Sequence, residues 1–353
     1  MANIKYIPVY LVGSPMLSTK YRYKGKPVNN IENNSENIYP YMLISVYHAM
    51  EKTNNFRQEY NISDNVFIFG DSGGFQNMTL GAKLEPLDVL RWQEKNCNAG
   101  FIFDNPIFQN DDKNIIETKQ VATVNNAFIA LNNRTTNMEL IAVIQGHSPN
   151  FIDSCIDLYE QHGGLSKFDR ISIGGLVPIA GNIDLLCKIV IYFIYKVKNY
   201  NKPIHFLGIS NEKIIYILTY LSKLLDINIT FDSSSPFSGA RFGDYYLSLK
   251  QKVSYNDKNI TKRVTTATPL LQQAIKDNEP LWLLGSLSTL HNLIVFEEEY
   301  QRINNMDLQE LEKHIYPQHK HIIEMTLKYG GRYMRSIYPE VVNDSKQYSI
   351  YDF

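Results

Sequence analysis

The sequence predicts an α/β fold, a (β/α)8 TIM barrel, and two observations support this prediction. Eight short apolar runs recur along the 353 residues, and stretches with a helical pattern separate most of them. The runs do not alternate apolar with polar residues, so we expect strands that are covered on both faces, as in a parallel sheet. Eight parallel strands that alternate with helices form a (β/α)8 barrel.

Each apolar run is expected to form one strand of the barrel. The runs are short, and most are followed by a polar residue or a glycine, which suits strands that end in loops. In chain order, the expected strands lie at 4–12, 41–46, 66–69, 100–103, 140–144, 170–173, 204–209 and 228–231.

Helix signals lie between several of these strands. A proline in the first turn opens a helix over 86–98. A Ser-Pro pair opens a second helix over 148–164, which stops at glycine, and a capping serine opens a third over 210–226. A further helix is indicated by an apolar stripe of Ile115, Val121, Val124, Phe128 and Leu131.

Composition narrows the classes of function. The formal net charge is −1, so a strongly basic coat for nucleic acid is absent and any such contact must be a local patch. The three cysteines lie far apart and form neither a disulfide framework nor a zinc-type pair, which favours a reducing compartment and a cytoplasmic location. No apolar run is long enough to predict a membrane span.

Polar residues and glycines follow the strands at the end where barrels carry out their chemistry. Any one of them alone is more often a helix cap or a turn residue, but their shared position at strand ends predicts a site. In strand order from the third to the eighth, they are Asp71, Asp104, Gln145 with Gly146, Gly174 with Gly175, Gly208 and Asp232.

Three carboxylates in one cleft indicate acid/base or nucleophilic catalysis at a C–O or C–N bond. A site for a hard cation is the competing interpretation, and His147 is the one histidine close to these strand ends. Glycines allow a flat ligand to approach the backbone, and an acid with an amide suits the edge of a purine.

The same residues resemble a known family, the tRNA-guanine transglycosylases. The resemblance covers about 66–303 and consists of motifs in the family's order: DSGGFQ (71–76), FDNP (103–106), QG (145–146), IGGL (173–176), FLGI (206–209), FDSSSPFSGARFG (231–243) and LLGSLSTLHNLIVFEEEYQRI (283–303). This family exchanges guanine in a nucleic acid for a 7-deazaguanine base by double displacement on a TIM barrel.

The resemblance implies a role for each strand-end residue. Asp232 would attack the sugar C1′ and form a covalent glycosyl-enzyme intermediate, and Asp71 would be the general acid and base. Asp104 would bind the amino and N1 edge of the base, while Gln145 and the Gly175 amide would face its carbonyl oxygen. The rest of the base pocket would be formed by Ser72, Phe75, Gly174 and Leu176.

The sequence departs from the family at its structural zinc site. Residues 244–290 contain no cysteine, so His291 stands without its expected thiolate partners, and one histidine cannot make a tetrahedral site. We therefore expect no zinc and no other cofactor. A second group, His314, His319 and His321, is expected to lie on a solvated helix or loop and not to bind a metal.

Other departures concern the polymer. His147 stands where a second glycine is usual, Pro106 where a cysteine is common, and Ser238 where an arginine of the tRNA-binding pattern is expected. Because the base-exchange residues remain, these departures favour the branch of the family that modifies DNA, encoded by bacterial islands and phages. Action on tRNA and a non-catalytic nucleic-acid-binding role stay open as alternatives.

Contacts with nucleic acid require local positive charge. The segment 18–27 interleaves basic residues with tyrosines, which suits phosphate contacts with stacking, although a solvated loop explains it equally well. Residues 250–263 form a weaker basic patch. The expected contacts with nucleic acid are Lys20, Arg22, Lys24, Lys26 and, after the nucleophile, Arg241.

The chain is expected to consist of a catalytic barrel over 1–245 and a C-terminal region over 246–353. The second region would supply helices that complete the barrel, together with the degenerate zinc region. Dimers are common in the family, so a homodimer is also an open expectation.

Overall fold

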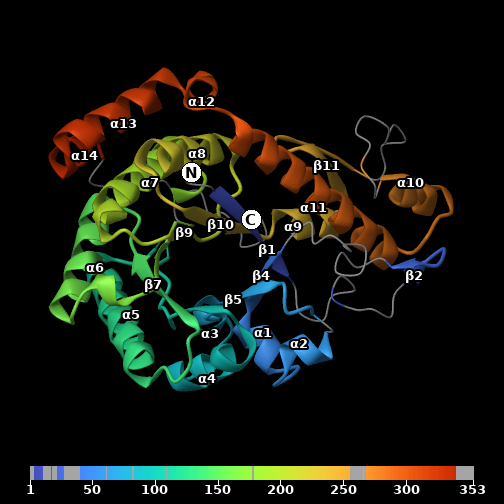
Figure 1. Cartoon of the computed structure of the whole chain (residues 1–353), viewed down its shortest axis with the longest axis horizontal. Coiled ribbons are helices and arrows are strands. Elements are labelled where there is room, and N and C mark those ends of the chain that lie inside the picture. The colour runs from blue at the N-terminus through green and yellow to red at the C-terminus, as the bar shows by residue number, and fades with distance from the viewer. Residues whose placement is uncertain are drawn as a thin grey trace.

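The computed structural model describes residues 4–10, 17, 22–27, 40–60, 62–81, 83–108, 110–176, 179–254, 265 and 268–338. Eight parallel strands close into a barrel, which confirms the predicted fold class (Figure 1). In their order around the barrel, the strands are β1 (Ile4–Tyr10), β10 (Ile229–Ser233), β9 (Ile204–Phe206), β8 (Arg170–Gly174), β7 (Glu139–Gln145), β6 (Ala99–Phe101), β5 (Phe67–Asp71) and β4 (Tyr41–Ser45).

Helices connect the successive barrel strands from β4 to β10 and form the outer layer (Figure 1), whereas the described part of the connection from β1 to β4 holds the short strands β2 (Arg22–Tyr23) and β3 (Lys26–Pro27). Each expected strand has a counterpart in the structure, and the bounds differ by a few residues. The connecting helices are α1 (Val46–Met50), α2 (Phe56–Glu59), α3 (Gly74–Leu80), α4 (Pro86–Asn96), α5 (Lys113–Asn133), α6 (Pro149–Gln161), α7 (Ile183–Val197) and α8 (Glu212–Leu225).

Helix starts are partly as predicted. The Ser148 side chain caps α6 by accepting a hydrogen bond from the Phe151 amide. The cap of α8 is Asn211, whose side chain accepts from the Lys213 amide, so the serine predicted for this role was the wrong residue.

The stripe predicted for α5 is also partly wrong, because Ile115 and Val121 are each 43% exposed while Val124 is buried. The buried face of α5 is shifted around the helix and includes the fully buried Gln120. Gln120 tolerates burial because its Nε2 donates to the carbonyls of Gln145 and Phe151 at 2.6 and 2.8 Å.

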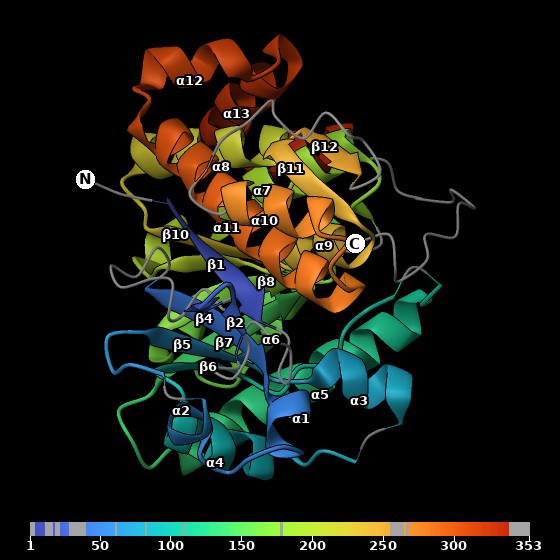
Figure 2. The same ribbon diagram turned by 90° about the vertical axis from the view of Figure 1, so that its right-hand side faces the viewer.

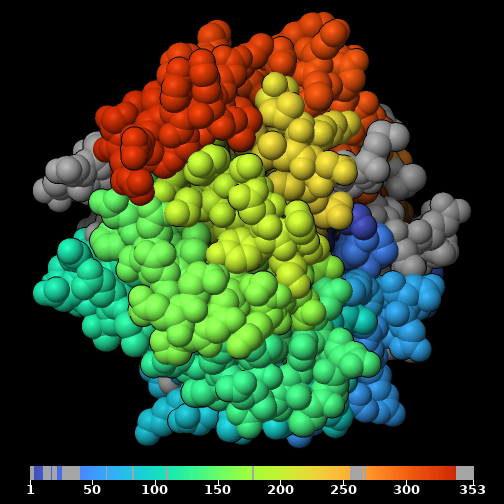
Figure 3. Space-filling view, turned by 60° about the vertical axis from the view of Figure 1, so that its left-hand side comes forward, coloured from blue at the N-terminus to red at the C-terminus, as the bar shows by residue number. Residues whose placement is uncertain are grey.

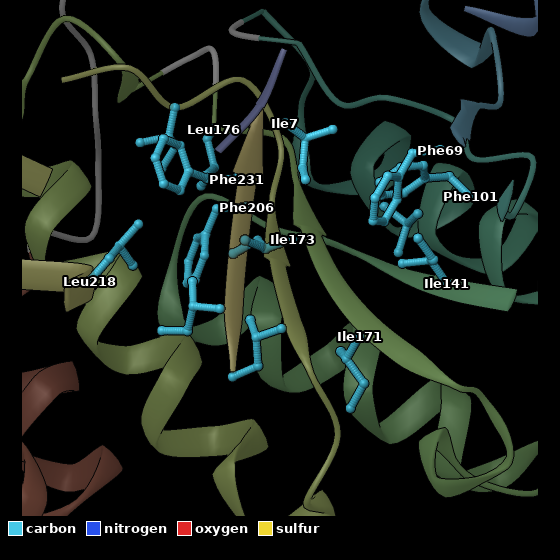
Figure 4. Close-up of a cluster of buried hydrophobic side chains, with 14 of the residues drawn as sticks. Ile7, Phe69, Phe101, Ile141, Ile171, Ile173, Leu176, Phe206, Leu218 and Phe231 are labelled. Atoms are coloured by element: carbon cyan, nitrogen blue, oxygen red, sulfur yellow. The ribbon is translucent and has the colours of Figure 1, made fainter. Parts of the chain in front are cut away.

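The barrel interior and the space beneath the helices form one hydrophobic core. Figure 4 shows part of it, where apolar side chains of several strands pack together. Phenylalanines contribute much of this volume, since Phe69, Phe101, Phe206 and Phe231 are each at most 1% exposed.

After the last barrel strand, the chain adds α9 (Ser235–Arg241), the hairpin β11 (Asp244–Ser248) with β12 (Gln251–Ser254), and α10 (Thr268–Lys276). The long helix α11 (Leu281–Asn305) then packs against α8, α9, β1 and β11. These contacts make α11 part of the wall around the barrel.

Three further helices cover the outside of α7 and α8. They are α12 (Leu308–His314), which packs on α8, α13 (Pro317–Tyr329), which packs on α7, and α14 (Gly331–Ile337), which contacts α6 and α7. Figure 3 shows this C-terminal layer lying directly against the surface of the barrel helices. No helix within the described residues is long and apolar enough to cross a membrane.

Candidate active site

The three predicted carboxylates lie at the same end of the barrel. Asp71 is the last residue of β5, Asp232 is the second-to-last residue of β10, and Asp104 follows β6 by three residues. Because all strands run parallel, these positions share one rim. In Figure 2, the helices α1, α3 and α9, which follow β4, β5 and β10 in the chain, lie to the right of these strands.

Asp71 is surrounded by features that favour its protonated form. Burial, followed by the negative charges of Asp104 and Asp232, raises the pKa of Asp71 to about 7, although the amides of Ser72 and Gly73 act in the opposite direction. Near neutral pH, this carboxyl group can therefore both donate and accept a proton.

Asp104 is held at both of its oxygens. The Ser72 hydroxyl donates to Oδ1 at 2.7 Å, and the Gln145 Nε2 donates to Oδ2 at 2.6 Å. Burial raises the pKa of Asp104, and the bonds from Ser72 and Gln145 oppose that rise. Gly74 is required beneath it, because a Cβ there would lie 2.2 Å from the Asp104 carbonyl oxygen.

Gln145 ends β7 and is 1% exposed. Since its Nε2 faces the Asp104 carboxylate, its Oε1 must point elsewhere, and within the described chain this buried oxygen has no hydrogen-bond partner. A buried acceptor without a partner is unfavourable, so a ligand that donates a hydrogen bond to Oε1 would bind favourably here.

The glycines at the end of β8 allow this amide and the Ile107 side chain to pack closely against the backbone. A Cβ at Gly174 would lie 2.8 Å from the Gln145 Nε2, and one at Gly175 would lie 2.5 Å from the Ile107 Cγ1. Gly175 also has a φ of +74°, which disfavours other residues. The next residue, Leu176, has a buried side chain, and its carbonyl accepts from the Ile179 amide.

Asp232 is 6% exposed and is fixed at one oxygen by two donors. The Gly208 amide and the His205 Nε2 each lie 3.0 Å from its Oδ1. Gly208 was predicted from the sequence as a strand-end residue, whereas His205 was missed.

His205 reaches Asp232 through the pairing of neighbouring strands. Thr230 on β10 is the register partner of His205 on β9, and Asp232 lies two residues further on, on the same face. A sequence signal existed, because a histidine inside an otherwise apolar strand needs a polar partner. The partner itself depends on the strand register.

Phe75 lies on α3 and is half-buried, with its ring 5.9 Å from that of Phe108 in an edge-on arrangement. Whether Phe75 contacts a bound base stays a prediction.

Six of the predicted site residues lie close together in the structure. They are Asp71, Ser72, Asp104, Gln145, Gly174 and Gly175.

The predicted contacts for nucleic acid have mixed surroundings. Tyr23 is 5% exposed and donates to the Asp277 carboxylate at 2.8 Å, and the Lys24 ammonium pairs with the same carboxylate at 2.8 Å. Tyr23 therefore packs against α10 and does not offer its ring for stacking. Arg22 donates to the Gly25 carbonyl, and Arg241 is exposed at the end of α9, directly after the strand of Asp232.

Lys20 and the side chain of Lys26 lie outside the part of the chain that the structure describes. The roles predicted for the basic residues stay predictions.

His291, which the resemblance in sequence aligns with a zinc ligand, has hydrogen-bond partners for both of its ring nitrogens. Its Nδ1 lies 2.8 Å from the Thr268 hydroxyl and 3.2 Å from that of Thr265, while its Nε2 lies 2.8 Å from the Tyr246 carbonyl. In the described parts of the chain, no group of three or more side chains suited to a metal ion comes together.

The expectation that His319 is solvated was wrong. His319 is 1% exposed, because α13 packs this face against α7, where its Nε2 lies 2.8 Å from the Asp184 carboxylate. His314 and His321 are exposed, and the His314 ring stacks on Tyr216 at 4.4 Å.

Neither the protein-family models that were scanned nor the curated proteins that were searched gave a match to this chain.

Proposed function

We propose that the protein is a transglycosylase that exchanges guanine in DNA for a 7-deazaguanine base, through a covalent intermediate on Asp232. The observation that carries the proposal is the contrast between two carboxyl groups at one rim. The pKa of Asp71 is raised to about 7, while Asp232 has two donors directed at a single oxygen. One group is suited to move protons and the other to act as a fixed nucleophile.

The first displacement joins Asp232 to the sugar. A lone pair of its carboxylate forms a bond to C1′, the C1′–N9 bond breaks with its electron pair moving to guanine, and Asp71 gives its proton to the departing base. Neutral guanine leaves, and Asp71 is left as a carboxylate.

The second displacement reverses these events with another base. Asp71 takes the N9 proton of the incoming base, N9 forms a bond to C1′, and the C1′–oxygen bond breaks with its electron pair returning to Asp232. Two inversions at one carbon retain the configuration of the sugar.

The neighbourhood of Asp104 suits the base. Its carboxylate can accept from the N1–H and the amino group of a guanine-like ring, and Gln145 keeps a second amide N–H for the ring's carbonyl oxygen. The free Gln145 Oε1 offers an acceptor for a further donor on the base. Gly174 and Gly175 allow the Gln145 amide to lie directly against the backbone at the end of β8, which places it beside the Asp104 carboxylate.

DNA is favoured over tRNA because the departures from the family pattern fall on residues expected to hold tRNA. Ser238 on α9 stands where an arginine is expected, and the thiolates of the zinc region are missing. We also propose that the enzyme works without zinc, since His291 already has partners for both ring nitrogens.

A competition experiment tests the proposal. The purified protein is given radiolabelled guanine together with duplex DNA, single-stranded DNA and tRNA, with and without a strong chelator. We expect label in DNA at the same rate with chelator present, and a loss to background in Asp232→Ala. Asp157→Ala, which removes an exposed carboxylate on α6, is the matched control and should keep the wild-type rate.

Label in tRNA alone would overturn the choice of polymer. Absence of label in every polymer, or equal rates for wild type and Asp232→Ala, would overturn the enzymatic function. A rate that falls with chelator would overturn the proposal of a zinc-independent enzyme.

A further inference from the structure

The buried imidazole next to the nucleophile has no assigned role in the exchange reaction. On the basis of the function proposed above, we propose that His205 is a positioning residue that occupies Oδ1 of Asp232, makes Oδ2 the oxygen that bonds C1′, and speeds the release of Asp232 in the second displacement.

The assignment of the two oxygens follows from their contacts. Oδ1 receives the Gly208 amide and the His205 Nε2, each at 3.0 Å. Oδ2 makes no hydrogen bond within the described residues. An oxygen whose lone pairs accept from two donors is a poor nucleophile, so the bond to C1′ forms at Oδ2.

The protonation pattern of the imidazole follows from its partners. An ionised carboxylate can only accept, so the His205 Nε2 must carry a proton toward Asp232. In the neutral ring, Nδ1 is then an acceptor, and the Thr230 hydroxyl lies 2.8 Å away to donate to it. Asp232 therefore requires this tautomer, and the Thr230 hydroxyl, which also lies 3.3 Å from the Ile204 carbonyl, is placed to stabilise it at Nδ1.

The ring is also fixed in place. His205 is fully buried, and its ring lies 4.9 Å from that of Phe101 and 6.0 Å from that of Phe69, measured between centroids. Both phenylalanines belong to the core drawn in Figure 4. This packing, together with the hydrogen bonds at both ring nitrogens, restricts the orientation of the imidazole, as is required of a group that positions a reactive one.

The two displacements use the hydrogen bond differently. A donor to Oδ1 stabilises the carboxylate more than the sugar ester, because the ester carries no negative charge. The second displacement regenerates the carboxylate as its leaving group, so it gains most from His205. Without this donor, the ester forms but is released slowly, and the covalent intermediate accumulates.

The test compares His205→Phe, which keeps a ring but removes both nitrogens, with His205→Gln, whose amide can still donate to Asp232. Labelled guanine exchange into DNA measures turnover, and a denaturing gel measures the fraction of enzyme joined to DNA at steady state. For His205→Phe we expect turnover to fall on the order of 10- to 100-fold and the joined fraction to rise. His205→Gln should restore most of both values.

A merely structural role predicts a different result. If turnover and the joined fraction fall together in His205→Phe, or if neither changes, the inference is wrong. Thr230→Val is a second test, because it keeps His205 and removes the hydroxyl at its Nδ1. We expect the fraction of enzyme joined to DNA to rise in this variant too, and an unchanged fraction would also overturn the inference.

The readout separates this inference from the function on which it rests. Wild-type protein that forms no covalent product with DNA would contradict the proposed function and, with it, the role of His205. If the wild-type protein forms the covalent product and the fraction of enzyme joined to DNA is the same in wild type and His205→Phe, the inference alone would be contradicted.

Discussion

At the level of single residues, the surroundings of the three carboxylates decide what each can do. Asp104 has a donor on each oxygen, and Asp232 has two donors on one oxygen. The pKa of Asp71 is instead raised by its burial and by the negative charges of Asp104 and Asp232. Under the proposed function, these surroundings suit the three identical side chains to separate roles: binding, attack and proton transfer.

Asp71 predicts the pH dependence of exchange. The first displacement needs its protonated form, and its pKa is raised to about 7, so kcat/KM for DNA should fall as pH rises through about 7. Asp71→Asn should lower exchange on the order of 100- to 10,000-fold and should not show this decline. Guanine exchange measured from mildly acidic to mildly alkaline pH checks both, and a wild-type profile that is flat across pH 7 would contradict the assignment.

Asp71 should also lower the stability of the folded protein as the pH rises. Its pKa of about 7 in the folded protein exceeds the value of 3.8 expected for an unperturbed aspartate, so the folded state holds this proton more tightly than the unfolded state. The ionised group thus destabilises the fold progressively as pH rises between these values. Asp71→Asn should raise the thermal midpoint relative to wild type, more at pH 8 than at pH 4.

At the level of elements, the contact between α7 and α13 depends on a buried histidine. His319 bonds to Asp184 at 2.8 Å, and its Nδ1 lies 3.8 Å from the Cys187 Sγ. The imidazole also lowers the pKa of Asp184, as expected for a carboxylate with a favourable partner. This bond, together with the apolar packing around it, holds the C-terminal layer on the barrel.

Removal of this histidine should loosen the layer. We expect His319→Ala to lower the free energy of unfolding by about 1–3 kcal/mol, because it loses a buried hydrogen bond and leaves a cavity. The exposed His321 lies on the same helix, and His321→Ala should change stability by less than about 0.5 kcal/mol. Urea unfolding of both variants checks the difference, and equal midpoints would show that His319 is dispensable.

Asn292 shows how one side chain joins the elements that follow β10. Asn292 on α11 accepts from the Tyr246 amide at 2.8 Å and donates to the Pro236 carbonyl at 3.0 Å. It therefore ties α11 to β11 and α9 together. With His291, it connects by hydrogen bonds a region where the resembling family uses a metal.

At the level of the whole molecule, the C-terminal region is integrated with the barrel. The ring of Tyr6 on β1 lies 6.0 Å from Phe296 and 4.9 Å from Tyr300, both on α11. A chain ending at residue 245 should therefore fail to unfold cooperatively, since the core would lose one wall. A chain ending at residue 306, which keeps α11, should retain the barrel with lower stability, and circular dichroism during heating distinguishes these outcomes.

Much of the site was predictable because it follows from the fold class. Once eight parallel strands are recognised, Asp71, Asp104, Gln145 and Asp232 must share a rim, whatever the details of packing. Helix caps were less predictable, since Ser210 and Asn211 both suit the start of α8 and the local backbone chose between them.

The sequence alone determined the class of fold, the end of the barrel that carries the polar residues, and the identity of three acids there. Those properties follow from patterns of neighbouring residues along the chain. The tertiary structure decided that His205 forms a hydrogen bond with Asp232, that the pKa of Asp71 is raised to about 7, and that His319 is buried. Each of these depends on groups brought together from distant segments, since strand register, burial and electrostatic neighbours are fixed only when the chain has packed.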